Sequence, residues 1–169
     1  MYPERPEVGD KITVLTTGGT IDKIYFDASS QFEVGETIVE HMLHQAAVQL
    51  PFEVIEVMRK DSLDLTDADR DQIRTAAASV AGEKIVVTHG TDTMTDTAAV
   101  LRSLPGKTIV LTGALAPARF AETDAMFNLG MAFAAVQALP HGVYIVMNGT
   151  LFDSEHVRKD RSLNAFVYK

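Results

Sequence analysis

Apolar residues along the chain follow two different spacings. Short apolar runs rich in β-branched residues predict buried strands, and the longer stretches with helical spacing between them predict helices. The expected strands are Ile12–Leu15, Phe52–Val57, Lys84–Val87, Thr108–Leu111 and Val143–Met147. The expected helices are Thr37–Val48, Thr66–Val80, Thr93–Leu101 and Glu122–Leu139. Because strands that alternate with helices form parallel sheets covered on both faces, the sequence predicts an α/β fold: a three-layer α/β/α domain with a mainly parallel sheet.

The segment Asp22–Gly35 interrupts this alternation. It has no strong period and mixes Gly, Ser, Asp and aromatic residues, so it is predicted to be a long loop or an irregular hairpin. Long loops in compact domains are often functional lids. No internal repeat or linker divides the 169 residues, and a chain of this length fits one domain of about 100 to 200 residues, predicted here as residues 1–169.

Composition and charge narrow the possible functions. A net charge of −8, without long runs of like charge, disfavours binding to nucleic acid or to anionic lipid. The absence of cysteine excludes disulfides, thiolate metal ligands and a cysteine nucleophile. Met1–Asp10 lacks the apolar core of a secretory signal, and no apolar stretch approaches the roughly 20 residues of a membrane span. We therefore expect a cytoplasmic protein that binds neither nucleic acid nor membrane.

Small polar residues gather where the predicted strands end. The clusters are Thr16–Thr20, Asp61 with Ser62, Thr88–Thr93, Thr112 with Gly113, and Asn148–Thr150. The carboxyl ends of parallel strands share one edge of the sheet, and α/β folds bind ligands at that edge, at the switch point in strand order. We expect these polar residues to converge there.

The first of these clusters offers a hydroxyl nucleophile. In Thr17–Thr20, two glycines let the backbone approach a ligand closely, and a threonine hydroxyl follows them. Alone, the pattern is more often ordinary turn chemistry. It lacks the later glycine of a dinucleotide fingerprint and the lysine of a P-loop, so it gives no support for a nucleotide site.

The cluster His89–Met94 places a hydroxyl, Thr91, beside a carboxylate, Asp92, where a strand is followed by a helix. Asp92 can hold a substrate ammonium and Thr91 can place its hydroxyl near a reacting atom, although either residue can instead cap the helix. A hydroxyl nucleophile needs a base. Lys159 is one candidate, because a partly desolvated lysine can serve as a base, and the alternative is a solvated surface charge. His89 is interpreted as a structural hydrogen-bonding residue.

The sequence gives little support for a metal site. His41 and His44 lie one helical turn apart, but no local pattern supplies the further ligands of a zinc site. We interpret them as a solvent-facing pair and expect neither a metal nor an organic cofactor.

The two hydroxyl-rich clusters taken together are specific. Thr17–Ile21 and His89–Met94 resemble the two signature motifs of bacterial-type L-asparaginases. Further similarity is found in Asp61 with Ser62, Thr112–Ala114 with Pro117, Phe127–Leu129, and Val146–Asn148 with Lys159. The resemblance spans almost the whole chain and corresponds to the N-terminal catalytic domain of that family, whose usual C-terminal domain is absent from this sequence.

The resemblance implies hydrolysis of the side-chain amide of L-asparagine without a cofactor. By position, Thr20 resembles the nucleophile that forms an acyl-enzyme and releases ammonia. Thr91, Asp92 and Lys159 resemble the second catalytic group, in which the lysine assists proton movement through the threonine. Tyr25 resembles the mobile tyrosine that orients the nucleophile.

The resemblance also implies a set of substrate-binding residues. Ser62 resembles the residue that binds the substrate carboxylate, Asp61 precedes it in the same motif, and Asp92 resembles a contact of the substrate amino group. The backbone amides near Gly19 and Thr91 are candidates for stabilising an oxyanion, a role in which fixed donors contribute a few kcal/mol.

Three departures from the family pattern stand out. Asp22 occupies a position where relatives usually have a small residue, and Leu63 one where many have a polar substrate-binding side chain. The usual second domain supplies an acidic residue to the site of a neighbouring subunit, and this sequence lacks it. We therefore expect a homo-oligomer, a dimer or a tetramer, in which another protomer closes the site.

Three functional hypotheses follow. The first is an L-asparaginase with Thr20 as nucleophile. The second is a glutaminase or broader amidase, because one methylene in a pocket is worth only about 1 to 3 kcal/mol and sequence does not decide side-chain length. The third is a non-catalytic asparagine-binding domain, suggested by the missing second domain.

Overall fold

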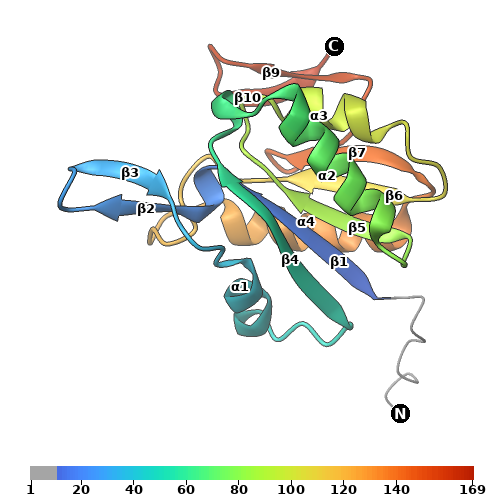
Figure 1. Ribbon diagram of the computed structural model, residues 1–169, viewed down its shortest axis with the longest axis horizontal. Coiled ribbons are helices and arrows are strands. Elements are labelled where there is room, and N and C mark those ends of the chain that lie inside the picture. Colours follow the sequence, from blue (N-terminus) through green and yellow to red (C-terminus); the bar gives the residue numbers. More distant parts are fainter. Residues whose placement is uncertain (1–10) are drawn as a thin grey trace.

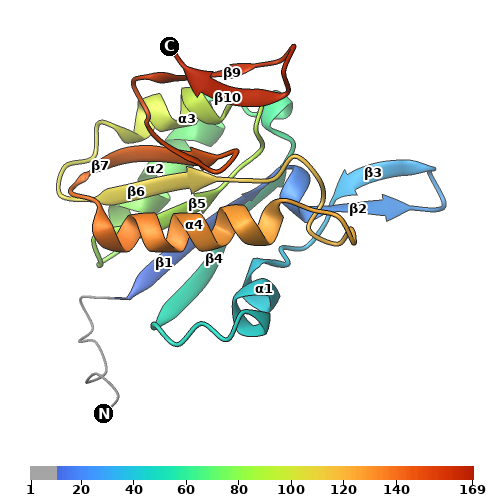
Figure 2. The same cartoon turned by 180° about the vertical axis from the view of Figure 1, so that it is seen from behind.

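A computed structural model describes residues 11–169, in which helices cover both faces of a six-stranded sheet (Figures 1 and 2). The strand order is β4-β1-β5-β6-β7-β8, and every pair is parallel except β7 with β8. The strands are β1 (Ile12–Gly18), β4 (Phe52–Lys60), β5 (Lys84–Thr88), β6 (Thr108–Thr112), β7 (Gly142–Met147) and β8 (Thr150–Asp153). The α/β fold with a mainly parallel sheet is confirmed. The sequence features of Met1–Asp10 lie outside the described residues.

Two pairs of helices form the outer layers. In Figure 1, α2 (Asp67–Ser79) and α3 (Met94–Leu101) cover the near face of the sheet, and Figure 2 shows α4 (Ala125–Ala138) across the other, with α1 (Val39–Gln45) beside it. Alternate residues of each strand feed two cores. Leu15 packs with the α2 and α3 side, and its neighbour Val14 packs with the α1 and α4 side. Burying each such side chain stabilises the fold by about 1.5–3 kcal/mol. Apolar residues are therefore favoured on both faces of the central strands.

Helix boundaries differ from the sequence prediction mainly at α1 and at the start of α4, which begins at Ala125 instead of Glu122. The helix α1 ends at Gln45 instead of Val48, because Ala47 adopts a left-handed backbone with φ of 53°. The helix α2 begins at Asp67 after the cap residue Thr66, whose hydroxyl accepts the amide of Asp69 while the Asp69 carboxylate accepts the Thr66 amide. No helix among residues 11–169 is long and apolar enough to cross a membrane.

Several short antiparallel strands lie outside the predicted pattern. Residues 22–35 contain a hairpin, β2 (Lys23–Phe26) with β3 (Gln31–Val34), which projects from the sheet in Figure 1. This agrees with the irregular hairpin, one of the two alternatives. The strand β8 and the pair β9 (Val157–Asp160) and β10 (Ala165–Tyr168) were not predicted, because segments of four residues are too short to show a clear period.

The strand order creates a crevice at β1. The chain leaves β1 toward β4 on one side and later returns to β5 on the other, so the switch in strand order lies at β1. The carboxyl edge at such a switch point is where open α/β sheets bind ligands. The fold thus places the Thr17–Thr20 and His89–Met94 motifs next to each other at this point.

Candidate active site

The loops after β1, β4 and β5 touch through positions that have no room for side chains. A Cβ atom on Gly19 would lie 2.4 Å from the Gly90 nitrogen, and one on Gly90 would lie 2.6 Å from Ser62 Oγ. Gly19 also has a φ of 85°, a conformation that L side chains rarely adopt, and its amide donates to the Lys60 carbonyl at 2.9 Å. The glycines therefore bring three of the predicted polar clusters into direct contact.

Lys159 joins two of the predicted catalytic residues. Its ammonium nitrogen donates to Thr91 Oγ1 at 2.7 Å and to Asp92 Oδ1 at 2.8 Å. The side chain of Lys159 is only 12 % exposed, whereas that of Asp92 is 31 % exposed. Pairing of Lys159 with Phe166 in the β9–β10 ladder fixes the backbone that carries the lysine. The long-range return of Lys159 to this edge, anticipated from the sequence, is present in the structure.

The Thr20 hydroxyl has no hydrogen-bond partner among the described residues. Thr20 begins the 3₁₀ helix Thr20–Asp22 shortly after β1 and is half-buried, whereas the partnerless hydroxyl of Thr16 is buried within β1. By contrast, Thr17, near the end of β1, donates its hydroxyl to the Thr88 carbonyl at 2.9 Å. Within residues 11–169, the Thr20 hydroxyl makes no hydrogen bond, and none links it to Thr91 or Lys159.

Ser62 has a buried hydroxyl without a partner among the described residues. The residue is 1 % exposed, and its Oγ atom lies beneath Gly90. Its backbone is held in place because the Thr93 hydroxyl donates to the Ser62 carbonyl at 2.8 Å. A buried hydroxyl without a hydrogen bond is costly, so Ser62 has hydrogen-bonding capacity available to a ligand.

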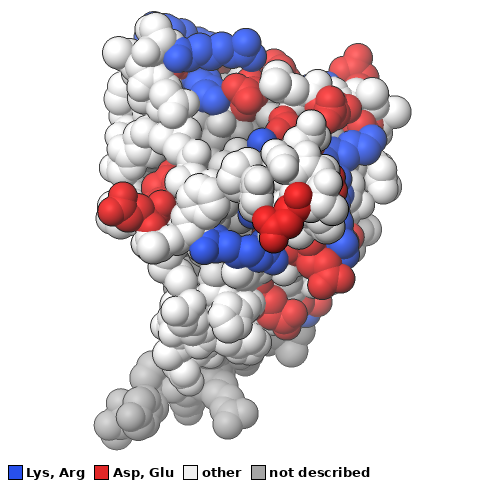
Figure 3. Space-filling model, turned by 90° about the vertical axis from the view of Figure 1, so that its left-hand side faces the viewer, with Lys and Arg blue, Asp and Glu red and all other residues white. Residues whose placement is uncertain are grey.

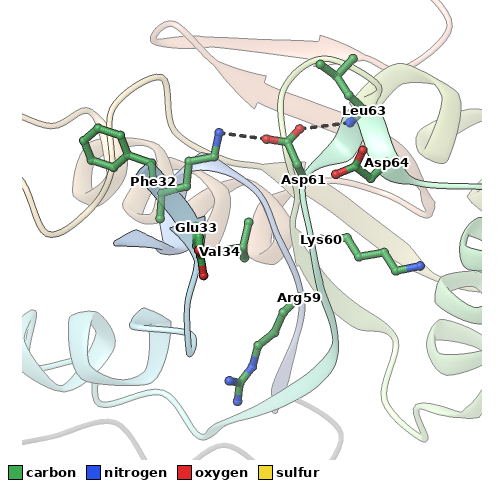
Figure 4. Close-up of a pocket in the computed structure, with 9 residues that line it drawn as sticks. Phe32, Glu33, Val34, Arg59, Lys60, Asp61, Leu63 and Asp64 are labelled. Carbon is green, nitrogen blue, oxygen red and sulfur yellow. Dashed lines mark hydrogen bonds and ion pairs between the residues drawn. The ribbon is translucent and has the colours of Figure 1, made fainter. Parts of the chain in front are cut away.

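Asp61 is occupied by structural contacts. One carboxylate oxygen lies 2.9 Å from the Lys23 ammonium and the other accepts the Leu63 amide at 3.1 Å, as Figure 4 shows. Burial raises the pKa of Asp61, but the hydrogen bonds from Lys23 and Leu63 outweigh it and hold the pKa below its ordinary value. The carboxylate links the base of β2 to the end of β4, so the structure gives it an anchoring role.

A cavity of about 620 Å³ lies beside these residues, between the β2–β3 hairpin and the end of β4. Asp61 belongs to its lining, but Thr20, Thr91, Asp92 and Lys159 do not. Acidic and basic side chains are interspersed on the face of the molecule seen in Figure 3. The cavity lining is likewise mixed in charge: Lys23, Phe32, Glu33, Val34, Arg59, Lys60, Asp61, Leu63 and Asp64.

Tyr25 lies on β2, away from the Lys159 cluster. Its side chain is 53 % exposed and packs against Phe32 with ring centroids 5.3 Å apart, and Phe32 in turn contacts Phe120 at 5.7 Å. No hydrogen bond joins Tyr25 to Thr20 in the part of the chain that the structure describes. Its predicted orienting role would require the hairpin to move toward the crevice.

His89 has the features of a structural residue. It is fully buried, its Nδ1 lies 2.6 Å from the Gly90 carbonyl, and its Nε2 lies 2.7 Å from Thr97 Oγ1. Because a carbonyl can only accept, Nδ1 carries the proton and Nε2 accepts from the threonine. Burial lowers the pKa of His89 to about 4, so the ring is neutral near pH 7 with both nitrogens engaged. This agrees with the structural interpretation made from the sequence.

The remaining histidines of the sequence analysis lie at the surface. His41 and His44 are both exposed on α1, in agreement with the predicted solvent-facing pair. Among residues 11–169, no group of three or more His, Asp or Glu side chains is arranged to hold a metal ion.

Two residues near the site were given no role from the sequence. Thr93, a member of the His89–Met94 cluster, donates to the Ser62 carbonyl, and Arg161 places its Nε 4.0 Å from Asp92 Oδ1 while remaining 70 % exposed. Arg161 lies in the turn after β9, and no local spacing in the sequence indicates its approach to Asp92.

Comparison with known proteins agrees with this arrangement. The family model described as "Asparaginase, N-terminal" matches residues 11–167. The chain belongs to the asparaginase family. It is 32 % identical over 173 residues to L-asparaginase 2 of Escherichia coli strain K12, covering 94 % of this chain and 49 % of the relative. It is 34 % identical over 148 residues to a component of the glutamyl-tRNA(Gln) amidotransferase of Pyrobaculum aerophilum, covering 82 % and 35 %.

Solved structures give the same result. The thermostable L-asparaginase from Thermococcus kodakarensis superposes with a TM-score of 0.82 at 27 % identity, covering 94 % of this chain and 51 % of that one. This asparaginase-family chain therefore spans about half the length, or less, of the relatives it matches.

Proposed function

We propose that this chain is an L-asparaginase that hydrolyses L-asparagine to L-aspartate and ammonia. The observation that carries the proposal is the hydrogen-bonded group of Lys159, Thr91 and Asp92, together with the contact of Gly19 and Gly90 that brings the loop of Thr91 against the loop of Thr20. A hydroxyl nucleophile, a proton-transfer group and a carboxylate at one strand edge are the components that amide hydrolysis needs.

In the first half of the reaction, Thr20 Oγ1 attacks the side-chain carbonyl carbon of asparagine. The hydroxyl proton passes to the departing nitrogen through Lys159 and Thr91, the C–N bond breaks, and ammonia leaves. The backbone amides near Gly19 and Thr91 stabilise the negative charge that develops on the carbonyl oxygen. In the second half, water attacks the Thr20 ester, releases aspartate and restores the hydroxyl.

Substrate binding follows from the unused polar groups of the site. Ser62 donates its hydroxyl to the substrate carboxylate after rotating from beneath Gly90, and the half-exposed Asp92 accepts the substrate ammonium. Asp61 supports this pocket by holding the end of β4 against Lys23. Tyr25 reaches Thr20 when the β2–β3 hairpin closes over the crevice.

The whole protein's setting is also a proposal. We propose a cytoplasmic homo-oligomer in which a second copy closes the open side of the crevice. The 31 % exposed Asp92 side chain supports this arrangement, because ligand sites bury most of a bound small molecule. Mixed charge on the surface of Figure 3 supports a small-molecule substrate and not nucleic acid.

A broader amidase, including a glutaminase, is the second candidate. The similarity to an amidotransferase component favours this candidate, because that relative is not named an asparaginase and its match still covers 82 % of this chain. The third candidate, a non-catalytic asparagine-binding domain, would keep Ser62 and Asp92 as ligand contacts without turnover.

Ammonia release from L-asparagine and from L-glutamine tests these candidates. The unmutated protein should hydrolyse asparagine with the higher kcat/KM, and Thr20→Ala should lower kcat at least about a thousandfold, as loss of a nucleophile typically does. Thr20→Ser retains a hydroxyl and should keep measurable activity. Thr150→Ala, in which the lost hydroxyl bonds only the Asn148 carbonyl, is a matched control that should behave like the unmutated protein.

Each outcome separates the candidates. A preference for glutamine would favour the broader amidase. Tight asparagine binding in a calorimeter without ammonia release would favour the binding domain, and full turnover by Thr20→Ala would refute the mechanism.

A further inference from the structure

Asp22 is a buried acid two residues after the proposed nucleophile. It ends the 3₁₀ helix Thr20–Asp22, and only 1 % of its surface is exposed. Its carboxylate accepts the amide of Ile38 at 3.0 Å, and Ile38 is the residue that caps the N-terminus of α1. One side chain thus links the turn that carries Thr20 to a helix 16 residues further along the chain.

The backbone of the same turn holds two other segments, the base of the hairpin and the loop before α4. The Asp22 carbonyl accepts the Gly35 amide at 2.9 Å, which closes the base of the β2–β3 hairpin, and it also accepts Nη1 of Arg119 at 3.3 Å. Arg119 donates its Nη2 to the Glu36 carbonyl at 2.9 Å. The Ala118 amide donates to the Ile21 carbonyl at 3.1 Å. The turn, the hairpin base, the start of α1 and the loop before α4 therefore meet at Asp22.

The Asp22 carboxylate lacks an ion-pair partner among residues 11–169. Arg119 donates its two hydrogen bonds to carbonyl oxygens. The other charged group that acts on Asp22 is Glu56 of β4, which is paired with Arg59. Burial raises the pKa of Asp22 to about 6, opposed by hydrogen bonds from Ile38 and Thr37. Burying a carboxyl costs free energy unless it is hydrogen-bonded, and the bond from the Ile38 amide offsets part of that cost.

The location of this bond matters for chemistry because the Asp22 amide also closes the turn around Thr20, donating to the Gly19 carbonyl at 3.2 Å. A shift of about 1 Å in a reacting group can cost on the order of a hundredfold in rate. We propose that Asp22 is a positioning residue: its carboxyl ties the Thr20 turn to the start of α1, and this anchors the backbone carbonyl that holds the base of the hairpin carrying Tyr25. The inference rests on the proposed amidase function.

Three variants separate positioning from general folding. Asp22→Ala removes the acceptor, Ile38→Pro removes the donor of the same bond, and Asp22→Asn keeps an acceptor oxygen of the same size. Asp27→Ala, an exposed aspartate at the tip of the same hairpin, is the matched control. Steady-state kinetics with L-asparagine and amide hydrogen exchange at Gly35 and Ile38 are the measurements.

Positioning predicts a split between kinetic constants. Asp22→Ala and Ile38→Pro should lower kcat at least tenfold while KM changes less than about threefold, and Asp22→Asn and Asp27→Ala should stay within about threefold of the unmutated kcat. Exchange at Gly35 should accelerate about tenfold in the first two variants only. An unchanged kcat in Asp22→Ala, or a kcat in Asp22→Asn as low as in Asp22→Ala, would overturn the positioning role.

Failure of the two proposals can be told apart. If the unmutated protein hydrolyses neither amide, the proposed function fails, and the exchange at Gly35 still decides whether Asp22 holds the hairpin base. Unchanged exchange in both bond-deleting variants would overturn the anchoring itself.

Discussion

Replacing His89 with glutamine measures how much one buried imidazole lowers the free energy of unfolding at low pH. In the native protein the ring is fully buried and neutral, with a donor bond to Gly90 and an acceptor bond from Thr97. Glutamine also offers one donor and one acceptor side, but it does not titrate. The pair of proteins therefore differs in a single ionisation between pH 4 and pH 7.

The expected magnitude follows from the pKa of His89. Burial lowers it from 6.5 to about 4, so between these pH values the unfolded chain binds a proton that the native protein does not. The stability that the neutral ring contributes is complete above pH 6.5 and is lost as the pH falls toward 4. At 1.36 kcal/mol for each pH unit, the loss is about 3 kcal/mol at pH 4. That is a large part of a typical unfolding free energy of about 5–15 kcal/mol.

Urea unfolding of both proteins at several pH values between 7.5 and 4 measures this loss. At pH 7.5 the His89→Gln variant should be less stable by about 1–3 kcal/mol, because its hydrogen bonds fit less well. At pH 4 the native protein should have lost about 3 kcal/mol relative to the variant, so the variant should be as stable as the native protein or more stable. Other titrating groups, such as Asp22, are common to both proteins and cancel in the difference. A gap that stays constant over the whole range would refute a depressed pKa for His89, and a thousandfold lower kcat in the variant would refute its structural role.

Three further substitutions test the site and the fold. Lys159→Met should lower kcat by about 10²- to 10⁴-fold, the range of proton-transfer catalysis. Its circular dichroism spectrum should stay native, because the Lys159 ammonium bonds only Thr91 and Asp92. Ammonia release measures the effect, and near-normal turnover would exclude the lysine from the chemistry. Gly19→Ala should destabilise the protein by more than about 1 kcal/mol in urea unfolding, because the new Cβ would overlap the Gly90 backbone nitrogen and φ is 85°. An unchanged urea midpoint would show that the loops can separate. Thr66→Ala should cost about 1 kcal/mol by loss of the α2 cap, a shift that a thermal melt detects and that an equal melt would contradict.

The strands β1, β5 and β6 were predictable because each is buried on both faces. Val86 and Val87, for example, belong to opposite cores, so their strand appears as a continuous apolar run in the sequence. The hairpin and the three terminal strands were harder, because they are short and partly exposed. Their positions depend on contacts such as the bond between the Phe166 amide and the Asn148 side chain, which joins residues 18 apart. No local spacing encodes that contact.

The sequence names candidate residues for the site but not its geometry. Residue types, strand-end positions and the family resemblance single out Thr20, Thr91 and Lys159, and the structure joins the last two by a hydrogen bond across 68 residues of sequence. The sequence did not indicate that Asp61 is committed to Lys23, or that Ser62 is enclosed beneath a glycine. Both facts depend on which loops happen to meet, and that is decided by the strand order.

The contact between the glycine loops also limits how this pocket can be redesigned. Any side chain at Gly19 or Gly90 collides with the neighbouring backbone or with Ser62, so mutational libraries at these positions would return mostly misfolded protein. Leu63, in contrast, follows Ser62 directly, is 62 % exposed and packs into neither buried core. New substrate ranges can therefore be sought at Leu63 with little risk to folding, while Gly19 and Gly90 are kept unchanged.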